Sequence, residues 1–307
     1  MDHSPILPGS PIAKALAVVG DRWTVLVMRE MFLGNTRFTE LANATGASRA
    51  TLSKRLRALV ANGVLYQNPY QDKPVRIEYR LTDKGFALYD FALSVWQWEY
   101  RWGERDGQRL PRRLRHRGCG HRFVPEPACA RCNAAIDIRE ISVRAGASAA
   151  GETGLNQGAL RRSSASLAAR STAQGLVLHF VDVVADHWTP LVLAAAFMGL
   201  HRYDDIRREL GIATNILSHR LKLLLEAGVL QQPGGTTPAE RRAYRLTEKG
   251  RALMIPALAL HVWSLHWLPP GKGPSMEIHH ACSTSPLHMH MRCSHCHAPL
   301  LATAVEF

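Results

Sequence analysis

The chain has 307 residues, of which 46% are hydrophobic and 21% charged, and its formal net charge is +13. This length and composition are sufficient for about two globular domains and argue against a disordered chain or a coiled coil. The positive charge favours an anionic partner, either nucleic acid, an acidic protein or a membrane surface. The excess is concentrated in residues 1–145, which carry 23 Lys and Arg against 14 Asp and Glu.

The first residues contain no basic region followed by an apolar run, so we expect no signal peptide. The longest apolar stretches, such as 191–200, are too short to cross a bilayer. We therefore expect a cytoplasmic, nucleoid-associated protein. In such a reducing compartment, its six cysteines are better suited to binding metal than to forming disulfides.

The first helices of the chain are marked by capping residues. Ser10 precedes Pro11, a favourable first helical residue, and a second helix is predicted over Arg22–Phe32 with its end near Gly34. A short helix over Arg37–Ala44 follows.

The next helix forms a helix-turn-helix with the one before it. Residues 45–47 form the turn, and Ser48 can cap the second helix of the pair. Its apolar residues Leu52, Leu56 and Leu59 recur at helical spacing, and Gly63 ends it.

A pair of strands and a long helix complete this segment. We predict strands over 64–67 and 76–81, joined by a loop over 68–74, which together form a wing. Thr82 is expected to cap a last helix that ends near Trp102.

The whole pattern occurs twice, at an offset of 165 residues. Residues 18–24 (VVGDRWT) return as 183–189 (VVADHWT), and residues 79–85 (YRLTDKG) return as 244–250 (YRLTEKG). One architecture must therefore explain both halves. In copy two we expect Thr214 to cap the second helix of the pair and Gly228 to end it.

These motifs resemble the HxlR-type helix-turn-helix regulators. The resemblance rests on residues 20–24 (GDRWT), 37–41 (RFTEL), 52–56 (LSKRL) and 76–82 (RIEYRLT) and covers about ninety residues in each copy. It implies a winged helix-turn-helix transcription factor, of a kind that usually acts as a homodimer. Ser10 stands where several members have a cysteine, so redox sensing at that position is not implied.

The expected fold class is mainly α with small β wings (α+β), with five segments. They are a first winged helix-turn-helix (1–108), a first Cys/His zinc knuckle (109–145), a flexible Gly/Ala/Ser-rich linker (146–172), a second winged helix-turn-helix (173–270) and a second knuckle (271–307). A loose extra helix over 160–169 is the alternative to the linker.

A helix in the major groove reads base edges from its N-terminal end, while flanking cations contact phosphates. We expect Arg49, Ala50 and Ser53 to face bases, and Thr51, Lys54 and Arg57 to contact phosphates. Arg55 could instead brace the fold. The remaining candidates are Arg37, Ser48, Lys73 and Arg76 in copy one, and Asn215, Ser218, His219, Lys222 and Arg241 in copy two. The structural alternative is that these side chains only solvate an exposed face.

A cysteine/histidine pattern follows the last helix of each copy. One histidine and three cysteines form a complete tetrahedral zinc set, so we expect about two structural zinc ions per chain. The first set is His116, Cys119, Cys129 and Cys132, and the second is His279, Cys282, Cys293 and Cys296. The histidines stay open, since His121 could replace His116, and His280 or His288 could replace His279. Free thiols and a redox Cys-x2-Cys pair are the alternatives to metal. Some HxlR-type members are similar in carrying a Cys-Gly-His and Cys-x2-Cys tail.

No phosphate-binding loop, nucleophile elbow or His-Glu-x2-His motif is found, so we predict that the chain is not an enzyme. We expect a sequence-specific regulator of double-stranded DNA. Its two winged helices would act as an intramolecular pseudo-dimer on an imperfect palindrome, about 10 base pairs apart. The chain would be a monomeric pseudo-dimer or a homodimer, with an unidentified small-molecule effector as a further partner. The alternative function is a zinc-containing protein adaptor whose second copy no longer binds DNA.

Overall fold

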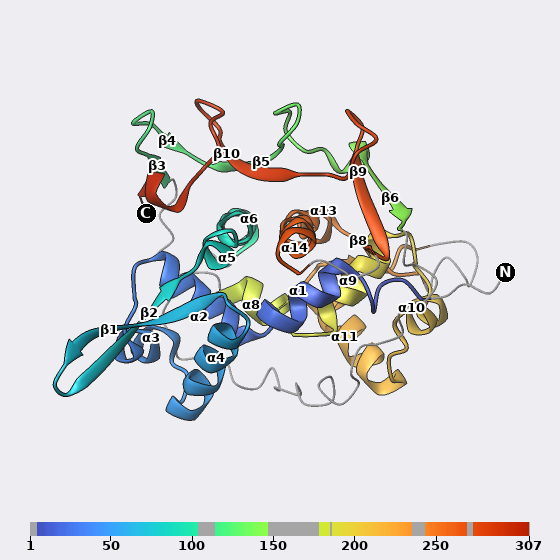
Figure 1. Ribbon diagram of the computed structural model, residues 1–307. Coiled ribbons are helices and arrows are strands. Elements are labelled where there is room, and N and C mark those ends of the chain that lie inside the picture. The colour runs from blue at the N-terminus through green and yellow to red at the C-terminus, as the bar shows by residue number, and fades with distance from the viewer. Residues whose placement is uncertain are drawn as a thin grey trace. The chain divides into compact units, whose positions relative to one another are not determined.

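The computed structural model describes residues 5–103, 114–146, 178–184, 186–234, 243–268 and 273–306 (Figure 1). The expected linker, apart from Gly146, and the predicted contact residue Arg241 lie outside the described residues.

The chain divides into two units that do not follow the two copies simply. Unit 1 comprises residues 1–16, 127–163 and 183–289, and unit 2 comprises residues 17–126, 164–182 and 290–307. The chain passes from one unit to the other within α1 (Pro11–Val19), β5 (Pro125–Cys129), α8 (Leu178–Val184) and β10 (Met289–Cys293). Each unit therefore combines segments from both copies, whereas the division expected from sequence was contiguous.

Unit 2 contains the winged helix of copy one. It runs through α2 (Arg22–Phe32), α3 (Phe38–Thr45), α4 (Arg49–Ala61) and the hairpin of β1 (Leu65–Asp72) and β2 (Val75–Leu81), and then α5 (Asp83–Phe86) and α6 (Tyr89–Trp102). The hairpin projects as a long ribbon beside α3 (Figure 1). A small three-stranded sheet follows, in the order β11 (Val305–Glu306), β3 (Leu114–His116) and β4 (Arg122–Phe123).

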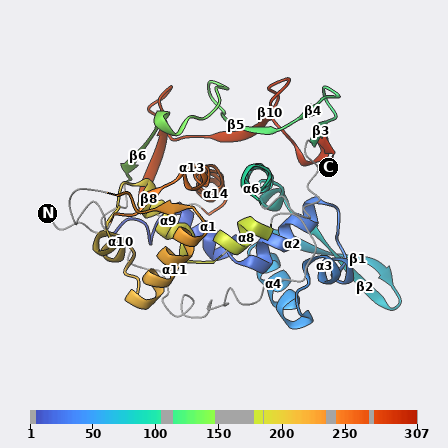
Figure 2. The same cartoon turned by 180° about the vertical axis from the view of Figure 1, so that it is seen from behind.

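Unit 1 repeats this plan with copy two, as the reverse view shows (Figure 2). Its elements are α9 (Thr189–Phe197), α10 (Tyr203–Leu210), α11 (Thr214–Glu226), β7 (Leu230–Gln231), β8 (Arg245–Leu246), α13 (Glu248–Arg251) and α14 (Met254–Trp267). In the same unit, β6 (Ile141–Ala145) of copy one pairs antiparallel with β9 (Met276–His280) of copy two. Within the described residues, 3-10 turns occur as η1 (Ile138–Glu140) in unit 1 and η2 (Ala302–Ala304) in unit 2.

Most predicted caps are confirmed. The Ser10 hydroxyl accepts a hydrogen bond from the Ala13 N–H at 3.2 Å, and the Ser48 hydroxyl accepts one from the Thr51 N–H at the same distance. Gly46, between α3 and α4, has a φ of +69°, a conformation that glycine adopts without a Cβ penalty. The predicted Thr214 cap is wrong. Ala213, which the 165-residue offset aligns with Ser48, is the N-cap of α11 and offers no side-chain bond.

Two predicted boundaries also change. The wing strands extend through most of the expected loop, and Asn68 pairs with Glu78 across the hairpin. The predicted last helix is divided into α5 and α6 by Ala87 and Leu88. Close approach explains the glycine in α5, because a Cβ at Gly85 would lie 2.3 Å from the Val64 carbonyl oxygen.

A segment before α2 in copy one and a segment before α9 in copy two are each bound by a glutamate of the other copy. In unit 1, Glu209 of α10 accepts hydrogen bonds from the Ile6 and Leu7 N–H groups at 2.8 and 2.9 Å. In unit 2, Glu99 of α6 accepts a hydrogen bond from the Phe180 N–H at 2.8 Å. Both carboxylates are buried, so these charge-assisted bonds fix the exchanged segments in place.

The mainly helical fold class with small sheets and two winged helix-turn-helix domains is therefore confirmed. Among the described residues, none of the helices is long and apolar enough to cross a membrane.

Candidate functional site

The helix α4 is anchored by one face and presents cations on the other. Leu52, Leu56 and Leu59 are buried at 0–1% exposure. Arg49, Lys54 and Arg57 are exposed, and no acidic residue lies within the helix. Helical spacing thus separates an apolar anchor from a cationic face that is free to meet a polyanion.

The other predicted contacts of α4 lie around this cationic face. Ser48 and Ala50 are exposed at its N-terminal end, and Thr51 and Ser53 are partly exposed. The Ser48 hydroxyl is also a donor, at 2.9 Å, to the Thr51 hydroxyl. The short side chains at the N-terminal end of α4 therefore allow a binding partner to approach the helix closely.

The wing carries the remaining candidates of copy one. Lys73 and Arg76 are exposed at the end of the hairpin. Arg37, also exposed, places its guanidinium over the Tyr70 ring of β1, 4.7 Å from the ring centroid. This cation–π contact holds a cation beside the wing without neutralising its charge.

Arg55 has the bracing role that the sequence left open. Its Nε lies 3.1 Å from Oδ1 of Asp21, the residue that caps α2. Copy two repeats the arrangement, with Arg220 Nε 3.5 Å from Oδ1 of Asp186. Arg55 thus ties α4 to the N-cap of α2, and Arg220 ties α11 to an aspartate that accepts hydrogen bonds from the Trp188 and Thr189 N–H groups at the start of α9.

In copy two, α11 is less basic on its exposed face. Asn215, Ser218, His219 and Lys222 are all exposed. The Lys222 ammonium, however, pairs with Glu226 at 3.8 Å, and the Ser218 hydroxyl lies 3.1 Å from the Tyr203 hydroxyl. Arg241, the last candidate, lies outside the described residues.

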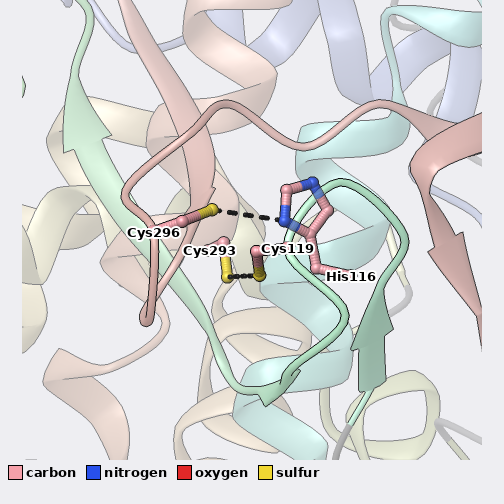
Figure 3. Close-up of side chains that lie close together, drawn as sticks. All are labelled: His116, Cys119, Cys293 and Cys296. Carbon is pink, nitrogen blue, oxygen red and sulfur yellow. Dashed lines mark hydrogen bonds between the residues drawn. The ribbon is translucent and has the colours of Figure 1, made fainter.

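The first Cys/His cluster lies in unit 2 and takes ligands from both copies. His116 and Cys119 of copy one face Cys293 and Cys296 of copy two (Figure 3). The Cys296 Sγ is 3.3 Å from the His116 Nδ1, and the Cys119 and Cys293 sulfurs are 4.0 Å apart. Tetrahedral zinc with Zn–S bonds near 2.3 Å separates its sulfurs by about 3.7 Å, so these residues fit such an ion.

The second cluster lies in unit 1 and is built the same way. Cys129 and Cys132 of copy one face His280 and Cys282 of copy two. The Cys129 and Cys282 sulfurs are 3.7 Å apart, and the Cys132 Sγ is 3.8 Å from the His280 Nδ1. On its other side, the His280 Nε2 lies 3.0 Å from a Glu140 carboxylate oxygen. A carboxylate there holds the proton on Nε2 and leaves Nδ1 free to bind metal.

The structure corrects the expected ligand partnerships. The spacing suggested one four-residue set within each copy, but each cluster combines two residues of one copy with two of the other. His280, which the sequence left as an alternative, occupies the place assigned to His279. Adjacent residues of a strand point to opposite faces, so His279 of β9 is directed away from its neighbour's cluster. Glu140 was missed, because no local pattern links it to a histidine 140 residues later.

Backbone N–H groups around each Cys-x2-Cys lower the pKa of one of its thiols. Burial of Cys129 opposes ionisation, but hydrogen bonds from the N–H groups of Cys132 and Arg131 and from the thiols of Cys282 and Cys132 together lower its pKa. In the other cluster, the Ala298 N–H lowers the pKa of Cys296. Burial raises the pKa of Cys282 to about 11 and also raises that of Cys293. Such thiols ionise fully only when a cation compensates the charge.

Six tryptophans recur at the 165-residue offset, as Trp23/Trp188, Trp98/Trp263 and Trp102/Trp267, and we interpret them as packing residues. Trp98 and Trp263 are 2% and 3% exposed, and the Trp98 ring contacts Phe180 edge-on at 5.7 Å. The other four, Trp23, Trp102, Trp188 and Trp267, are partly exposed.

These features place the chain in the class of winged-helix regulators. They are a helix-turn-helix with a wing and a cationic second helix, and a cysteine/histidine segment follows them in each copy. Comparison with known families agrees. The model of the HxlR-like helix-turn-helix family matches residues 18–107 and 183–272, so the chain belongs to this family. It does so twice over, which confirms the internal duplication. Members of this family are transcriptional regulators and not enzymes.

Individual relatives match less than half of this chain. An uncharacterized HTH-type transcriptional regulator of Mycobacterium tuberculosis, Rv3095, is 39% identical over 145 residues, covering 47% of this chain and 91% of the relative. YvaP of Bacillus subtilis, also an HTH-type regulator, is 37% identical over 103 residues, or 33% of this chain and 94% of the relative. Among solved structures, PA1374 of Pseudomonas aeruginosa is 28% identical, with a TM-score of 0.33 over 48% of this chain and 96% of its own.

Proposed function

We propose that this protein is a transcriptional regulator that binds double-stranded DNA sequence-specifically through α4. The observation that carries this proposal is the exposed, acid-free cationic face of α4, anchored by buried leucines and flanked by a wing. A helix of this kind enters the major groove, and arginine matches the guanine O6 and N7 atoms.

The roles of individual side chains follow from their places on the helix. Arg49, Ala50 and Ser53, near the N-terminal end of α4, face bases. Thr51, Lys54 and Arg57, with Ser48 at the cap, contact phosphates. From the wing, Lys73, Arg76 and Arg37 reach the minor groove or its flanking phosphates.

The second copy contributes a weaker DNA contact through α11 and acts with copy one as a pseudo-dimer within the chain. Support comes from the exchange of segments between the units, because unit 1 and unit 2 each need residues of both copies. Asn215, Ser218, His219 and Lys222, together with Arg241, would contact DNA. Since the two reading helices differ, the operator is an imperfect palindrome.

Both Cys/His clusters hold structural zinc, about two ions per chain. The support is the donor set, since in each unit the ligand atoms of one histidine and three cysteines all lie within 4.8 Å of one another. A bound zinc ion supplies a tetrahedral cross-link with no open position. Because each cluster unites the two copies, the ions would hold the copies together.

The test is selection of bound duplexes from a random pool with the full zinc-loaded chain, followed by affinity measurements over a range of salt. We expect an asymmetric two-part site and a steep fall in affinity as salt rises, since neutralised phosphates release counterions. No enriched duplex, together with salt-insensitive capture of a protein, would favour the adaptor instead. A single half-site would remove copy two from the DNA contact.

A further inference from the structure

The helix-turn-helix of copy two contains a hydrogen-bonded contact that joins its two helices. The Tyr203 hydroxyl of α10 donates a hydrogen bond to the Thr214 carbonyl oxygen of α11 at 2.9 Å, and it lies 3.1 Å from the Ser218 hydroxyl oxygen. Ser218 nevertheless remains exposed. The contact therefore leaves Ser218 accessible to a partner that approaches α11.

The direction of each hydrogen bond follows from the chemistry of the groups. A carbonyl oxygen can only accept, so the one proton of the Tyr203 hydroxyl is donated to Thr214. The bond between the two hydroxyls must then take its proton from Ser218, with Tyr203 as the acceptor. The Ser218 oxygen keeps only lone pairs for a further partner, so this serine can accept a hydrogen bond but cannot donate one.

Copy one lacks this restriction. The 165-residue offset aligns Tyr203 with Phe38 and Ser218 with Ser53. Phe38 has no hydroxyl, so the proton of Ser53 is not used in this way. A serine hydroxyl that is free to rotate can donate to a base edge or accept from one. The two copies therefore present the same side chain with different hydrogen-bonding capacity.

We propose that Tyr203 is a positioning residue that sets base specificity in copy two by making Ser218 an acceptor only. In the major groove adenine and cytosine present amino donors, whereas guanine and thymine present only acceptors. Two acceptors that face each other are both left unpaired, which weakens binding. Ser218 should accordingly prefer adenine or cytosine over guanine or thymine on the strand that it contacts. This inference rests on the proposed DNA contact of α11.

The test uses the full zinc-loaded chain and the duplex that selection identifies. Ser218→Ala first locates the base pair that this serine reads, because the preference is lost there. Four duplexes that differ only at that base pair are then titrated with the wild type and with Tyr203→Phe, which installs the aromatic ring of copy one.

The wild type should bind the amino bases about three- to tenfold more tightly than the keto bases, the range expected for one hydrogen bond. In Tyr203→Phe this difference should fall below about twofold, while the affinity for the best duplex is nearly kept. The matched control is Tyr244→Phe, which removes another hydroxyl of unit 1, one that hydrogen-bonds to the Gln232 side chain. It should keep the preference of the wild type.

Two results would overturn the role of Tyr203 alone. One is an unchanged preference in Tyr203→Phe, and the other is an equal loss of affinity for all four duplexes, as a purely structural role would give. In both cases the two-part site persists, so the proposed function stands. A single selected half-site, or a Ser218→Ala variant that alters no base preference, would remove Ser218 from the base contact and overturn this inference together with its proposed role in DNA binding.

Discussion

The Cys296 sulfur lies 3.3 Å from the His116 Nδ1, although 180 residues separate the two in the chain. His116 follows the winged helix of copy one, and Cys296 is the last cysteine of copy two. This contact shows that the Cys/His segments of the two copies combine, so that neither copy completes a cluster by itself. A metal bound here would connect the two copies directly.

Paired substitutions should distinguish exchanged clusters from clusters within one copy. Cys119→Ala with Cys129→Ala removes two thiols of copy one and therefore one ligand from each cluster. Because a structural zinc site needs all four ligands, we expect the metal content to fall from about two ions per chain to near zero. Elemental analysis of the purified variant measures it.

The control is Cys119→Ala with Cys293→Ala, which also removes two thiols but takes both from the unit 2 cluster. About one ion should remain in this variant. If the first pair retained one ion and the second lost both, the ligands would be partnered within each copy and the exchange would be wrong.

What the sequence could predict was local. The Ser48 cap, the leucine stripe of α4 and the end at Gly63 each depend on residues within a few positions of one another. Periodicity and capping therefore sufficed. The wing was underestimated, because Asn68 and Pro69 favour a turn by composition but pair across the hairpin with Glu78 and Ile77. Tertiary pairing overrode local preference.

The ligand partnerships could not be predicted for a different reason. Both copies carry a His/Cys pair and a Cys-x2-Cys, so any pairing of these halves satisfies the spacing. Which halves meet depends on where the chain crosses between units, and that is decided by long-range packing. The choice between His279 and His280 depends on which residues of β9 point towards the cluster, since a shift of one residue along a strand places a side chain on the opposite face of the sheet.

Loss of cations from α4 should weaken DNA binding in two distinguishable ways. Arg49→Ala should cost about 1–3 kcal/mol on the selected duplex and relax specificity at one base pair, as expected for an arginine that reads guanine. Lys54→Ala should weaken binding to all duplexes and reduce the salt slope by about 1, as expected for one phosphate contact. Titrations at several salt concentrations measure both effects.

Arg144→Ala is the matched control, since it removes the same charge from an exposed position on β6. It should leave specificity intact. Equal losses for Arg144→Ala and Arg49→Ala would mean that net charge alone governs the affinity.

The Asp186–Arg220 ion pair should contribute more to stability than the Asp21–Arg55 ion pair. Asp186→Asn keeps a side-chain oxygen for the Trp188 and Thr189 N–H groups but removes the charge facing Arg220, whose side chain is only 9% exposed. We expect a loss of about 2–4 kcal/mol, because an uncompensated cation remains buried. Asp21→Asn should cost less than about 1 kcal/mol, since the Arg55 side chain is 33% exposed and water screens the pair.

Because the chain has two units, local stability is the informative measurement. Hydrogen exchange of the α11 amides in Asp186→Asn is compared with that of the α4 amides in Asp21→Asn. Equal changes at the two braces would contradict a role for burial.

Asp90 should make the stability of the chain depend on pH. Burial raises the pKa of Asp90 from 3.8 to about 6, although the carboxylate accepts a hydrogen bond from the Met291 N–H at 2.8 Å. Near pH 4 and below, the native state keeps the proton at no cost. As the pH rises from about 4 to about 6 the unfolded state ionises first, so the native state loses stability, and above that range the loss is complete.

Asp90→Asn accepts the same hydrogen bond and cannot ionise. We expect it to be more stable than the wild type by about 1–2 kcal/mol above pH 6, allowing for partial solvent contact and the lost helix-dipole interaction. The advantage should shrink towards pH 4. Denaturant unfolding of both proteins at matched pH measures the difference, and loss of metal at low pH affects both alike. A difference that stayed constant from pH 4 to pH 8 would show that ionisation of Asp90 has no part in it.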